Sequence, residues 1–313
     1  MRFISPILGL ERRRDATVHP PELREDTYLS DGAYPVNLFR NVCPAGSVGR
    51  SALYLHWHDH FEWIYMVSGH AIFHIDSQPF EAAPGDLLLV PSGGLHVGYA
   101  LEDGPIEYWS IVFNRSLLQG LAVDPLHERY LAPYAEGRQR FSVKFGADAS
   151  DFEPLRRAVQ EIGSEYAHKK RAYELVVKAR LYEMFALAAR FCMPEREGEQ
   201  ADRTGRRMDR FKSLVLHIEA HYADKLTIEG AAKLVNLNPY HFCKVFKNAT
   251  GRTFVEFVNQ HRMNVADRLL REGELTVTEI AERIGIANPN YFTKLFKQIK
   301  GVTPSEARKR GDR

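Results

Sequence analysis

The chain has 313 residues, of which 44% are hydrophobic, and its 42 Lys and Arg nearly balance 40 Asp and Glu. This length and composition predict a folded protein of two domains and exclude a disordered or fibrous one. No apolar run approaches the roughly eighteen residues that cross a bilayer, so we expect no membrane partner. The three cysteines are scattered, which argues against a disulfide framework and favours a reducing compartment.

The first residues form a short apolar patch followed by Arg12, Arg13 and Arg14. An export signal places its charge before the apolar stretch, so this order argues against secretion. We therefore expect a cytoplasmic protein, with residues 1–30 forming an arm ahead of the first domain.

Between residues 34 and 113 the sequence predicts short strands separated by turns. Five segments are rich in β-branched and aromatic residues, namely 61–67, 71–75, 79–83, 86–90 and 106–113. Glycine, proline and short polar runs interrupt them at the spacing of hairpins. This pattern is typical of a small antiparallel barrel or jelly roll, and we assign residues 1–148 to the arm and this barrel.

A histidine-rich motif lies within the predicted barrel. It reads His56-x-His58-x-x-x-Glu62, and a second motif, beginning at Gly85, ends in His96. In a continuous strand alternate side chains share a face, so the even-numbered residues of the first motif, including His60, are expected to point to one side. If that side is the barrel interior, the candidate ligand-binding residues are His56, His58, Glu62 and His96. Three imidazoles and a carboxylate also suit a divalent transition metal.

These two motifs resemble the paired motifs of the cupin barrel, apart from Ala100, which stands where an asparagine is expected. Three uses remain open for the four polar side chains: binding a small polar ligand, holding a metal, or forming a polar core without a ligand. We predict a ligand pocket with no cofactor, no metal and no catalytic residue. A metal, if bound, is expected on the same four side chains.

Two amphipathic helices are predicted after the barrel, within residues 149–193. In the first, apolar residues recur at intervals of three and four, and Ser150 with Glu153 is expected to form its capping box. The second, about residues 172–191, has a wider apolar surface than packing on one sheet requires. Residues 194–208 lack apolar periodicity and are rich in charge, as in a solvated linker.

The remainder, residues 209–313, contains one helix-turn-helix pattern twice, at about 227–248 and 276–299. The alanines that begin the pattern, Ala232 and Ala281, are 49 residues apart, and the phenylalanines near its end are 50 apart, so one residue is inserted at the turn. Repetition at a fixed spacing is hard to obtain from composition alone. It indicates one structural unit used twice.

Each copy contains the residues that a crossed pair of helices needs. Asn236 and Gly285 occupy the turn, where the backbone requires a positive φ that asparagine and glycine tolerate best. The Asn-Pro pairs at 238–239 and 288–289 are expected to cap the second helix and to fit its first turn. A helix at about 253–271 is predicted to join the copies, and at 1.5 Å per residue it is roughly 25–30 Å long. Thr253 with Glu256 is expected to form its capping box, and Thr276 with Glu279 that of the next helix.

The second helix of each copy is predicted to bury phenylalanines four residues apart and to expose a polar face. The exposed positions, which we take as candidate DNA contacts, are Tyr240, His241, Cys243, Lys244 and Lys247 in the first copy and Asn290, Thr293, Lys294 and Lys297 in the second. Residues 209–313 hold 18 Lys and Arg against 12 Asp and Glu, whereas the rest of the chain is net acidic. Basic, hydrogen-bonding side chains on a supported helix suit reading of the major groove of double-stranded DNA. A helical bundle with basic faces is the alternative, and the matched turns and lysines argue against it.

Residues 209–310 resemble the tandem helix-turn-helix domain of the AraC/XylS transcription regulators. The resemblance lies in the Ile280-Ala281 start, the Phe296-Lys297 end and the Gly301-x-Thr303-Pro304 close. It implies regulation of transcription, usually activation through RNA polymerase. It also implies a homodimer formed by the helices in 149–193 and a small-molecule effector, a sugar or sugar derivative, in the barrel. Arg262 matches a family arginine that is structural. Ala307 stands where the family has a tyrosine, so we expect weaker packing of the last helix.

The sequence therefore predicts an α+β protein of two domains, a cupin-like antiparallel barrel with helices and an all-α tandem helix-turn-helix domain. We expect a ligand-controlled transcription regulator rather than an enzyme. Two alternatives remain: a metal-dependent cupin enzyme fused to a DNA-binding module, and a dimeric regulator that needs no ligand.

Overall fold

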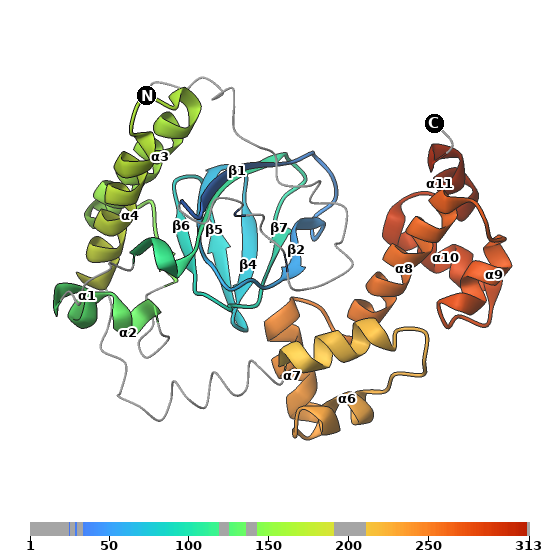
Figure 1. Ribbon diagram of the computed structural model, residues 1–313. Helices are drawn as coiled ribbons and strands as arrows, with labels where there is room; N and C mark the ends of the chain where they lie inside the picture. Colours follow the sequence, from blue (N-terminus) through green and yellow to red (C-terminus); the bar gives the residue numbers. More distant parts are fainter. Residues whose placement is uncertain are drawn as a thin grey trace. The chain divides into compact units, whose positions relative to one another are not determined.

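The computed structural model describes residues 25, 29, 34–118, 125–135, 143–190 and 211–311. The chain divides into two compact units, residues 1–206 and 207–313 (Figure 1). The first contains antiparallel sheets with helices and the second is helical, which confirms the predicted α+β class. Among the described residues, no helix combines the length and the apolarity that crossing a bilayer requires.

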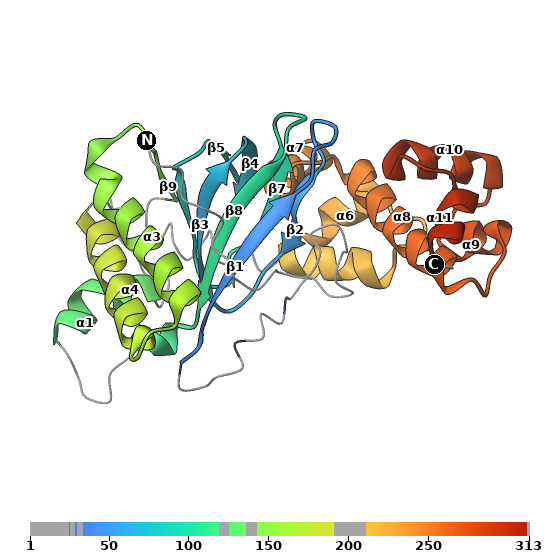
Figure 2. The ribbon, with the colours of Figure 1, turned by 90° about the horizontal axis from the view of Figure 1, so that it is seen from above.

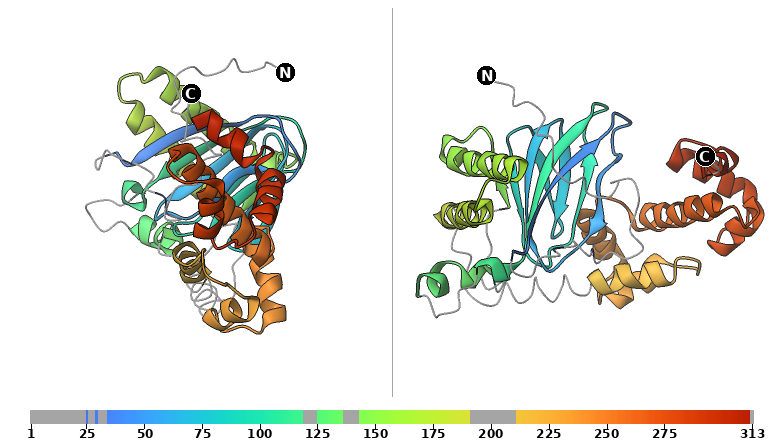
Figure 3. Two further views of the ribbon diagram at one scale, coloured as in Figure 1. Left: turned by 90° about the vertical axis from the view of Figure 1, so that its right-hand side faces the viewer. Right: turned by 45° about the horizontal axis from the view of Figure 1, so that its top comes forward.

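Two antiparallel sheets face each other in the first unit (Figures 2 and 3). One has the order β1-β8-β3-β6-β9 and the other β2-β7-β4-β5. The strands are β1 (Val36–Cys43), β2 (Ser51–His56), β3 (Phe61–Ser68), β4 (Ala71–Ile75), β5 (Gln78–Ala82), β6 (Leu87–Val90), β7 (His96–Ala100), β8 (Ile106–Phe113) and β9 (Lys144–Phe145). The five predicted strands are confirmed to within a residue, whereas β1, β2, β7 and β9 were not predicted.

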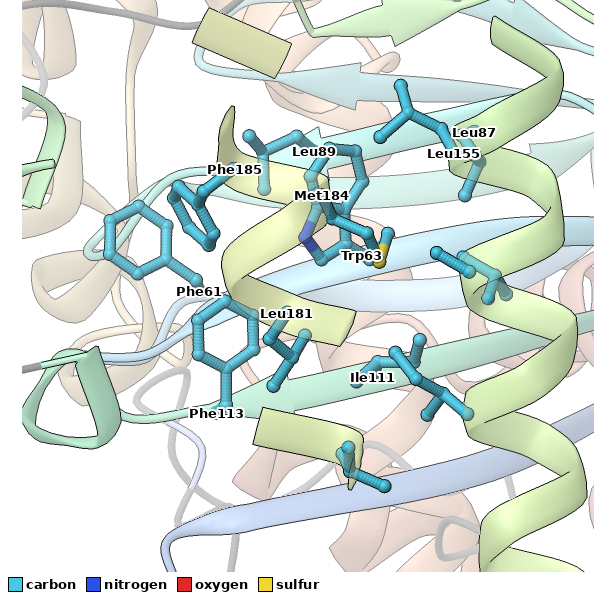
Figure 4. Packing of buried hydrophobic residues seen from close by; sticks show 14 of the residues in the cluster. Phe61, Trp63, Leu87, Leu89, Ile111, Phe113, Leu155, Leu181, Met184 and Phe185 are labelled. Carbon is cyan, nitrogen blue, oxygen red and sulfur yellow. The ribbon is translucent and has the colours of Figure 1, made fainter. Parts of the chain in front are cut away.

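The alternating side chains of β3 serve two different cores. Ile64 and Met66 belong to the apolar cluster between the sheets. Trp63 belongs to a second cluster, in which the five-stranded sheet packs against two helices, α3 (Glu153–His168) and α4 (Tyr173–Arg190). Figure 4 shows this second cluster, with Trp63 beside Met184 of α4. The sheet is thus buried on both faces, as its apolar strands require.

The helix α3 does not begin as predicted. Residues Ser150–Phe152 form a 3-10 turn, and the helix starts at Glu153 without a side-chain cap, so the expected capping box between Ser150 and Glu153 is wrong. Phe152 occupies the cap position because its ring packs edge-on against Phe145, with ring centroids 5.3 Å apart. The Glu153 carboxylate instead accepts hydrogen bonds from Arg156 at 2.8 and 3.0 Å.

Two apolar side chains of α4 lie on the surface of the first unit. Leu175 is 67% exposed and Val176 is 37% exposed, while Val177 and Leu181 on the opposite side are buried. The smaller helices of this unit are the 3-10 helix Arg115–Leu118, α1 (Pro125–Tyr130) and α2 (Ala132–Ala135). The predicted linker, residues 194–208, and most of the arm lie outside the described residues.

The second unit contains a helix over residues 211–220 followed by the two predicted motifs. Its other helices are α6 (Ile228–Leu234), α7 (Pro239–Thr250), α8 (Phe254–Glu272), α9 (Val277–Arg283), α10 (Pro289–Lys300) and α11 (Pro304–Gly311). Capping boxes begin α8 and α9 as predicted, each between a threonine and the glutamate three residues later. In the first box, hydrogen bonds from the Thr253 backbone and side chain lower the pKa of Glu256.

The turns and caps of both motifs are confirmed. Asn236 has φ 57° and Gly285 has φ 77°, the left-handed values that the pattern requires. Asn238 accepts a hydrogen bond from the His241 amide at 2.8 Å. Asn288 accepts hydrogen bonds from the amides of the first turn of α10 at 2.9 and 3.1 Å. Each second helix therefore starts at a fixed residue, which sets the direction of its exposed side chains.

The closing helix α11 packs on the second motif although Ala307 stands where the family has a tyrosine. Ala307 is 2% exposed and lies in the same apolar cluster as Phe292 and Phe296. The Arg308 guanidinium donates a hydrogen bond to the Leu275 carbonyl, just before α9. The helix α11 also lies against α8.

Arg262 is structural, as the family resemblance implies. From the middle of α8 it donates hydrogen bonds to the carbonyls of Tyr222 (2.7 Å) and Asp224 (2.9 Å), in the loop before α6. We expect Arg262→Ala to destabilise the second unit by about 2 kcal/mol, because two carbonyls lose a charged donor. Denaturant unfolding measures this change, with Arg268→Ala, an exposed arginine on the same helix, as control. Equal losses in the two variants would contradict the structural role.

Candidate DNA-reading surface and sensor site

The helix α7 presents one face of polar side chains. Phe242 and Phe246 are fully buried, and Phe246 packs against Phe254 and Phe257 of α8 with ring centroids 5.5 Å apart. All five predicted contact residues of this helix are exposed, and Tyr240 is the most exposed at 87%. The phenylalanines thus anchor the helix while its opposite face stays available.

The helix α10 repeats this arrangement. Phe292 and Phe296 are fully buried, and the four predicted contact residues, Asn290, Thr293, Lys294 and Lys297, are exposed. The Thr293 hydroxyl donates a hydrogen bond to the Pro289 carbonyl at 2.9 Å. With the hydroxyl engaged in this way, the Thr293 methyl group is the part that offers an apolar contact, such as the one that reads a thymine methyl.

One exposed aromatic residue of α10 was missed by the sequence reasoning. Tyr291 is 52% exposed and stands three residues after the capping Asn288, the place that His241 holds after Asn238 in the first copy. Aligning the two copies at their capping asparagines, rather than at their alanines, would have identified it.

The helix α8 separates the two motifs. Its first residues contact α7, whereas Met263, Ala266 and Leu270 share an apolar cluster with Phe292 and Phe296 of α10. Figure 1 shows α7 at one end of α8 and α10 towards the other. With 19 residues at 1.5 Å each, α8 is about 28 Å long, close to the roughly 34 Å between successive major grooves.

Burial lowers the pKa of His261, in the middle of this helix, to about 4.

Four polar side chains of the first unit meet between the two sheets. His56 ends β2, His96 begins β7, Glu62 lies in β3 and His58 lies in the connection between β2 and β3. Each is at most 1% exposed. The predicted convergence of these four residues is therefore observed.

The reason given for this convergence was wrong. The chain bends after β2, so His56 and Glu62 do not share a strand; they come from opposite sheets and face each other. His60 is outside the group, because it is only partly buried and its Nδ1 accepts a hydrogen bond from the Asn114 amide at 3.1 Å. His56 and His96 are joined by pairing between β2 and β7, which sequence alternation cannot predict.

The three histidine rings of this group share one hydrogen-bonding pattern. Each Nδ1 lies 2.9–3.0 Å from a backbone carbonyl, that of Tyr54 for His56, His60 for His58 and Gly94 for His96. A carbonyl only accepts hydrogen bonds, so Nδ1 carries the proton and Nε2 faces the group. The Nε2 atoms of His58 and His96 lie 3.0 and 3.3 Å from Oε2 of Glu62.

A fifth polar residue, missed by the sequence reasoning, reaches this group. Glu25 precedes the barrel, and its Oε2 lies 3.0 Å from Nε2 of His56. Its other oxygen accepts a hydrogen bond from the Tyr54 hydroxyl, and its backbone amide donates one to the Trp57 carbonyl at 2.9 Å. No motif in the surrounding sequence identifies Glu25, because its contact with His56 is a tertiary contact that no local pattern predicts.

A tandem helix-turn-helix unit with two exposed polar helices, joined to a sheet unit that buries a polar cluster, defines a DNA-binding regulator with a ligand-binding domain. Comparison with known families agrees: residues 231–310 match the helix-turn-helix domain, and residues 50–185 match the AraC-like ligand binding domain. The chain belongs to the AraC family of helix-turn-helix transcriptional regulators.

Relatives match along most of the chain. The uncharacterized HTH-type transcriptional regulator YdeC of Bacillus subtilis is 26% identical over 257 residues, which cover 82% of this chain and 86% of the relative. The MmsAB operon regulatory protein of Pseudomonas aeruginosa is also 26% identical, with 81% and 76% covered. Among solved structures, fatty-acid-bound ToxT from Vibrio cholerae is 16% identical with a TM-score of 0.36, and 87% of this chain and 94% of that chain are covered.

Proposed function

We propose that α7 and α10 read base edges of double-stranded DNA in two successive major grooves. The observation that carries this proposal is the matched construction of the two helices, each capped by asparagine, anchored by two buried phenylalanines and exposing two lysines at the same positions. In this proposal Lys244 and Lys294 contact bases or phosphates near the helix centres. Tyr291 joins the nine residues predicted from the sequence.

We also propose that the barrel is the sensor, within residues 1–148, and that His56, His58, Glu62 and His96 bind a small polar effector. Sugars and sugar derivatives are the first organic class to test, because their hydroxyl groups donate hydrogen bonds to imidazole nitrogens and carboxylates. The helices within 149–193 are proposed to form a homodimer, which would cover the exposed Leu175 and Val176 of α4. Residues 194–208 then connect them to the DNA-binding domain, residues 209–313.

Effector binding is proposed to act through a shift between two arrangements of the dimer. A ligand changes this balance only by the difference between its affinities for the two arrangements. One arrangement occupies the operator and contacts RNA polymerase in the cytoplasm, so that the protein acts as an activator. Reporter expression with and without effector tests the sign of this regulation.

The DNA-reading proposal predicts that Lys294→Ala weakens binding of the full chain to its operator. We expect a loss of about 1–3 kcal/mol of binding free energy if Lys294 contacts a base. If it contacts a phosphate, we expect the same loss of affinity for every DNA sequence. The slope of log affinity against log salt concentration is then expected to fall by about 1. Titration of operator and scrambled fragments at several salt concentrations separates these two cases.

Lys170→Ala is the matched control, because it removes the same charge from the surface of the first unit. This variant is expected to bind DNA as the wild type does. An Lys294→Ala protein with unchanged affinity and unchanged sequence preference would refute the assignment of α10 as a reading helix.

A further inference from the structure

We infer that Asn290 and Thr293 of α10 determine sequence preference, with Asn290 reading adenine in one base pair and Thr293 reading the thymine methyl group of a neighbouring pair. The inference rests on the proposed reading of DNA by α7 and α10, and it names the bases that one of these helices recognises. The first motif is not expected to share this preference.

The two reading helices have the same lysines but different residues in their first turns. When the copies are aligned at their capping asparagines, Asn290 takes the place of Tyr240, and Thr293 takes the place of Cys243. Contacts to phosphates position a protein on the duplex, whereas contacts to base edges carry sequence information. Shared lysines suit the positioning role in both motifs, so the positions that differ are the candidates for distinguishing the two sub-sites.

The side-chain amide of Asn290 is available for a base edge. Asn290 is the second residue of α10 and is exposed, and residues near the start of a recognition helix are those that reach base edges. Another residue, Asn288, makes the helix cap by accepting hydrogen bonds from the backbone amides of Asn290 and Tyr291 at 2.9 and 3.1 Å. The side-chain carbonyl and NH2 group of Asn290 are therefore not part of the cap.

An asparagine amide is complementary to adenine in the major groove. Adenine presents an acceptor, N7, beside a donor, the N6 amino group, so the amide can donate to the first and accept from the second. Guanine presents two acceptors at the same places, which leaves the amide carbonyl without a donor. A polar group left unpaired in an interface costs more than the hydrogen bond contributes, so this contact discriminates between the two bases.

The group that Thr293 offers, one turn farther along α10, is a methyl group. The Thr293 hydroxyl donates its proton to the Pro289 carbonyl at 2.9 Å, so it does not donate to the acceptors of a base. Thymine is the base that carries a methyl group in the major groove. Side chains three residues apart on a helix have Cβ atoms about 5–6 Å apart, and base pairs are stacked about 3.4 Å apart, so Asn290 and Thr293 suit neighbouring pairs.

The first copy lacks this combination of groups. Tyr240 is 87% exposed and ends in a phenol hydroxyl, and Cys243 is an exposed free thiol. Neither side chain has an amide that could form two hydrogen bonds with adenine. The two sub-sites are therefore expected to differ in sequence, which gives the chain one orientation on its site.

Selection of bound fragments from a random double-stranded DNA library by the full chain gives the site on which this inference is tested. We expect one of its sub-sites to contain an adenine whose replacement, A·T by G·C, weakens wild-type binding about 10- to 100-fold. Asn290→Ala is expected to bind the two sequences with equal affinity. The matched control is Gln298→Ala, which removes an exposed amide near the other end of α10 and is expected to keep the full preference.

Changes to single groups of the DNA test the same contacts without altering the protein. In place of the adenine, 7-deazaadenine lacks the N7 acceptor, and it is expected to weaken wild-type binding about tenfold and to leave Asn290→Ala unaffected. Uracil in place of the neighbouring thymine removes only the methyl group, and it is expected to weaken wild-type binding about threefold. Thr293→Ser keeps the hydroxyl and loses the methyl group, so we expect it to bind both DNAs equally.

The possible results separate this inference from the proposed function. A site without a required adenine, an adenine preference that persists in Asn290→Ala, or a loss that is the same for every sequence would overturn the role of Asn290. An equal effect of uracil on the wild type and on Thr293→Ser would overturn the role of Thr293. In these cases the full chain still selects a site, so the proposed function stands. A full chain that selects no sequence would overturn the proposed function, and this inference with it.

Discussion

Gly285→Ala is expected to unfold the second motif and to abolish operator binding. Gly285 has φ 77°, and a Cβ atom added there would lie 2.0 Å from the carbonyl oxygen of Ala223 and 2.7 Å from its carbonyl carbon. The left-handed conformation alone costs an alanine about 1–2 kcal/mol. The collision adds a further cost of about 1–3 kcal/mol, because the backbone must move apart. The sum is a large part of the stability of a small domain.

The collision and the backbone strain can be separated with Gly301→Ala. Gly301 has φ 73°, nearly the same as Gly285, but a Cβ there would have no heavy atom within 4 Å. We therefore expect Gly301→Ala to lose only the conformational part. Denaturant unfolding of the full chain, with hydrogen exchange in the second unit, measures both variants. Equal destabilisation of the two would show that the approach of Ala223 does not constrain the turn.

Glu62→Gln is expected to remove the effector response of the barrel. Glu62 is fully buried and its Oε2 lies within 3.3 Å of Nε2 of both His58 and His96, so it supplies the negative charge of the cluster. A wild-type protein saturated with effector at 100 times its dissociation constant gains about 2.7 kcal/mol of stability. The glutamine variant is expected to gain almost none, because the amide has the same shape but no charge.

Thermal unfolding with a panel of carbohydrates and divalent ions measures this response, and operator binding without effector is measured beside it. Operator binding is expected to persist in Glu62→Gln, since the substitution lies in the first unit. The control is Glu102→Gln, which removes an exposed carboxylate of the same unit and is expected to keep the full response. A Glu62→Gln protein that responds as strongly as the wild type would remove Glu62 from the sensor site.

The features that the sequence predicted best are local. The capping boxes at Thr253 and Thr276, the caps at Asn238 and Asn288 and the left-handed turn residues were all confirmed. Each depends on hydrogen bonds or backbone angles within about four residues, so the sequence alone contains the necessary information. The capping box expected at Ser150 failed because a distant ring, that of Phe145, holds Phe152 at the cap position.

The amino-acid sequence by itself determined the repeated helix pair, the polar faces of its second helices and the set of four side chains in the barrel. Only the tertiary structure decided how those four meet. His56 and His96 come together through pairing of β2 with β7, Glu62 faces them from the other sheet, and Glu25 arrives from a segment without a motif. Sequence patterns report the periodicity of one element, whereas contacts between elements depend on strand pairing and packing over long separations along the chain.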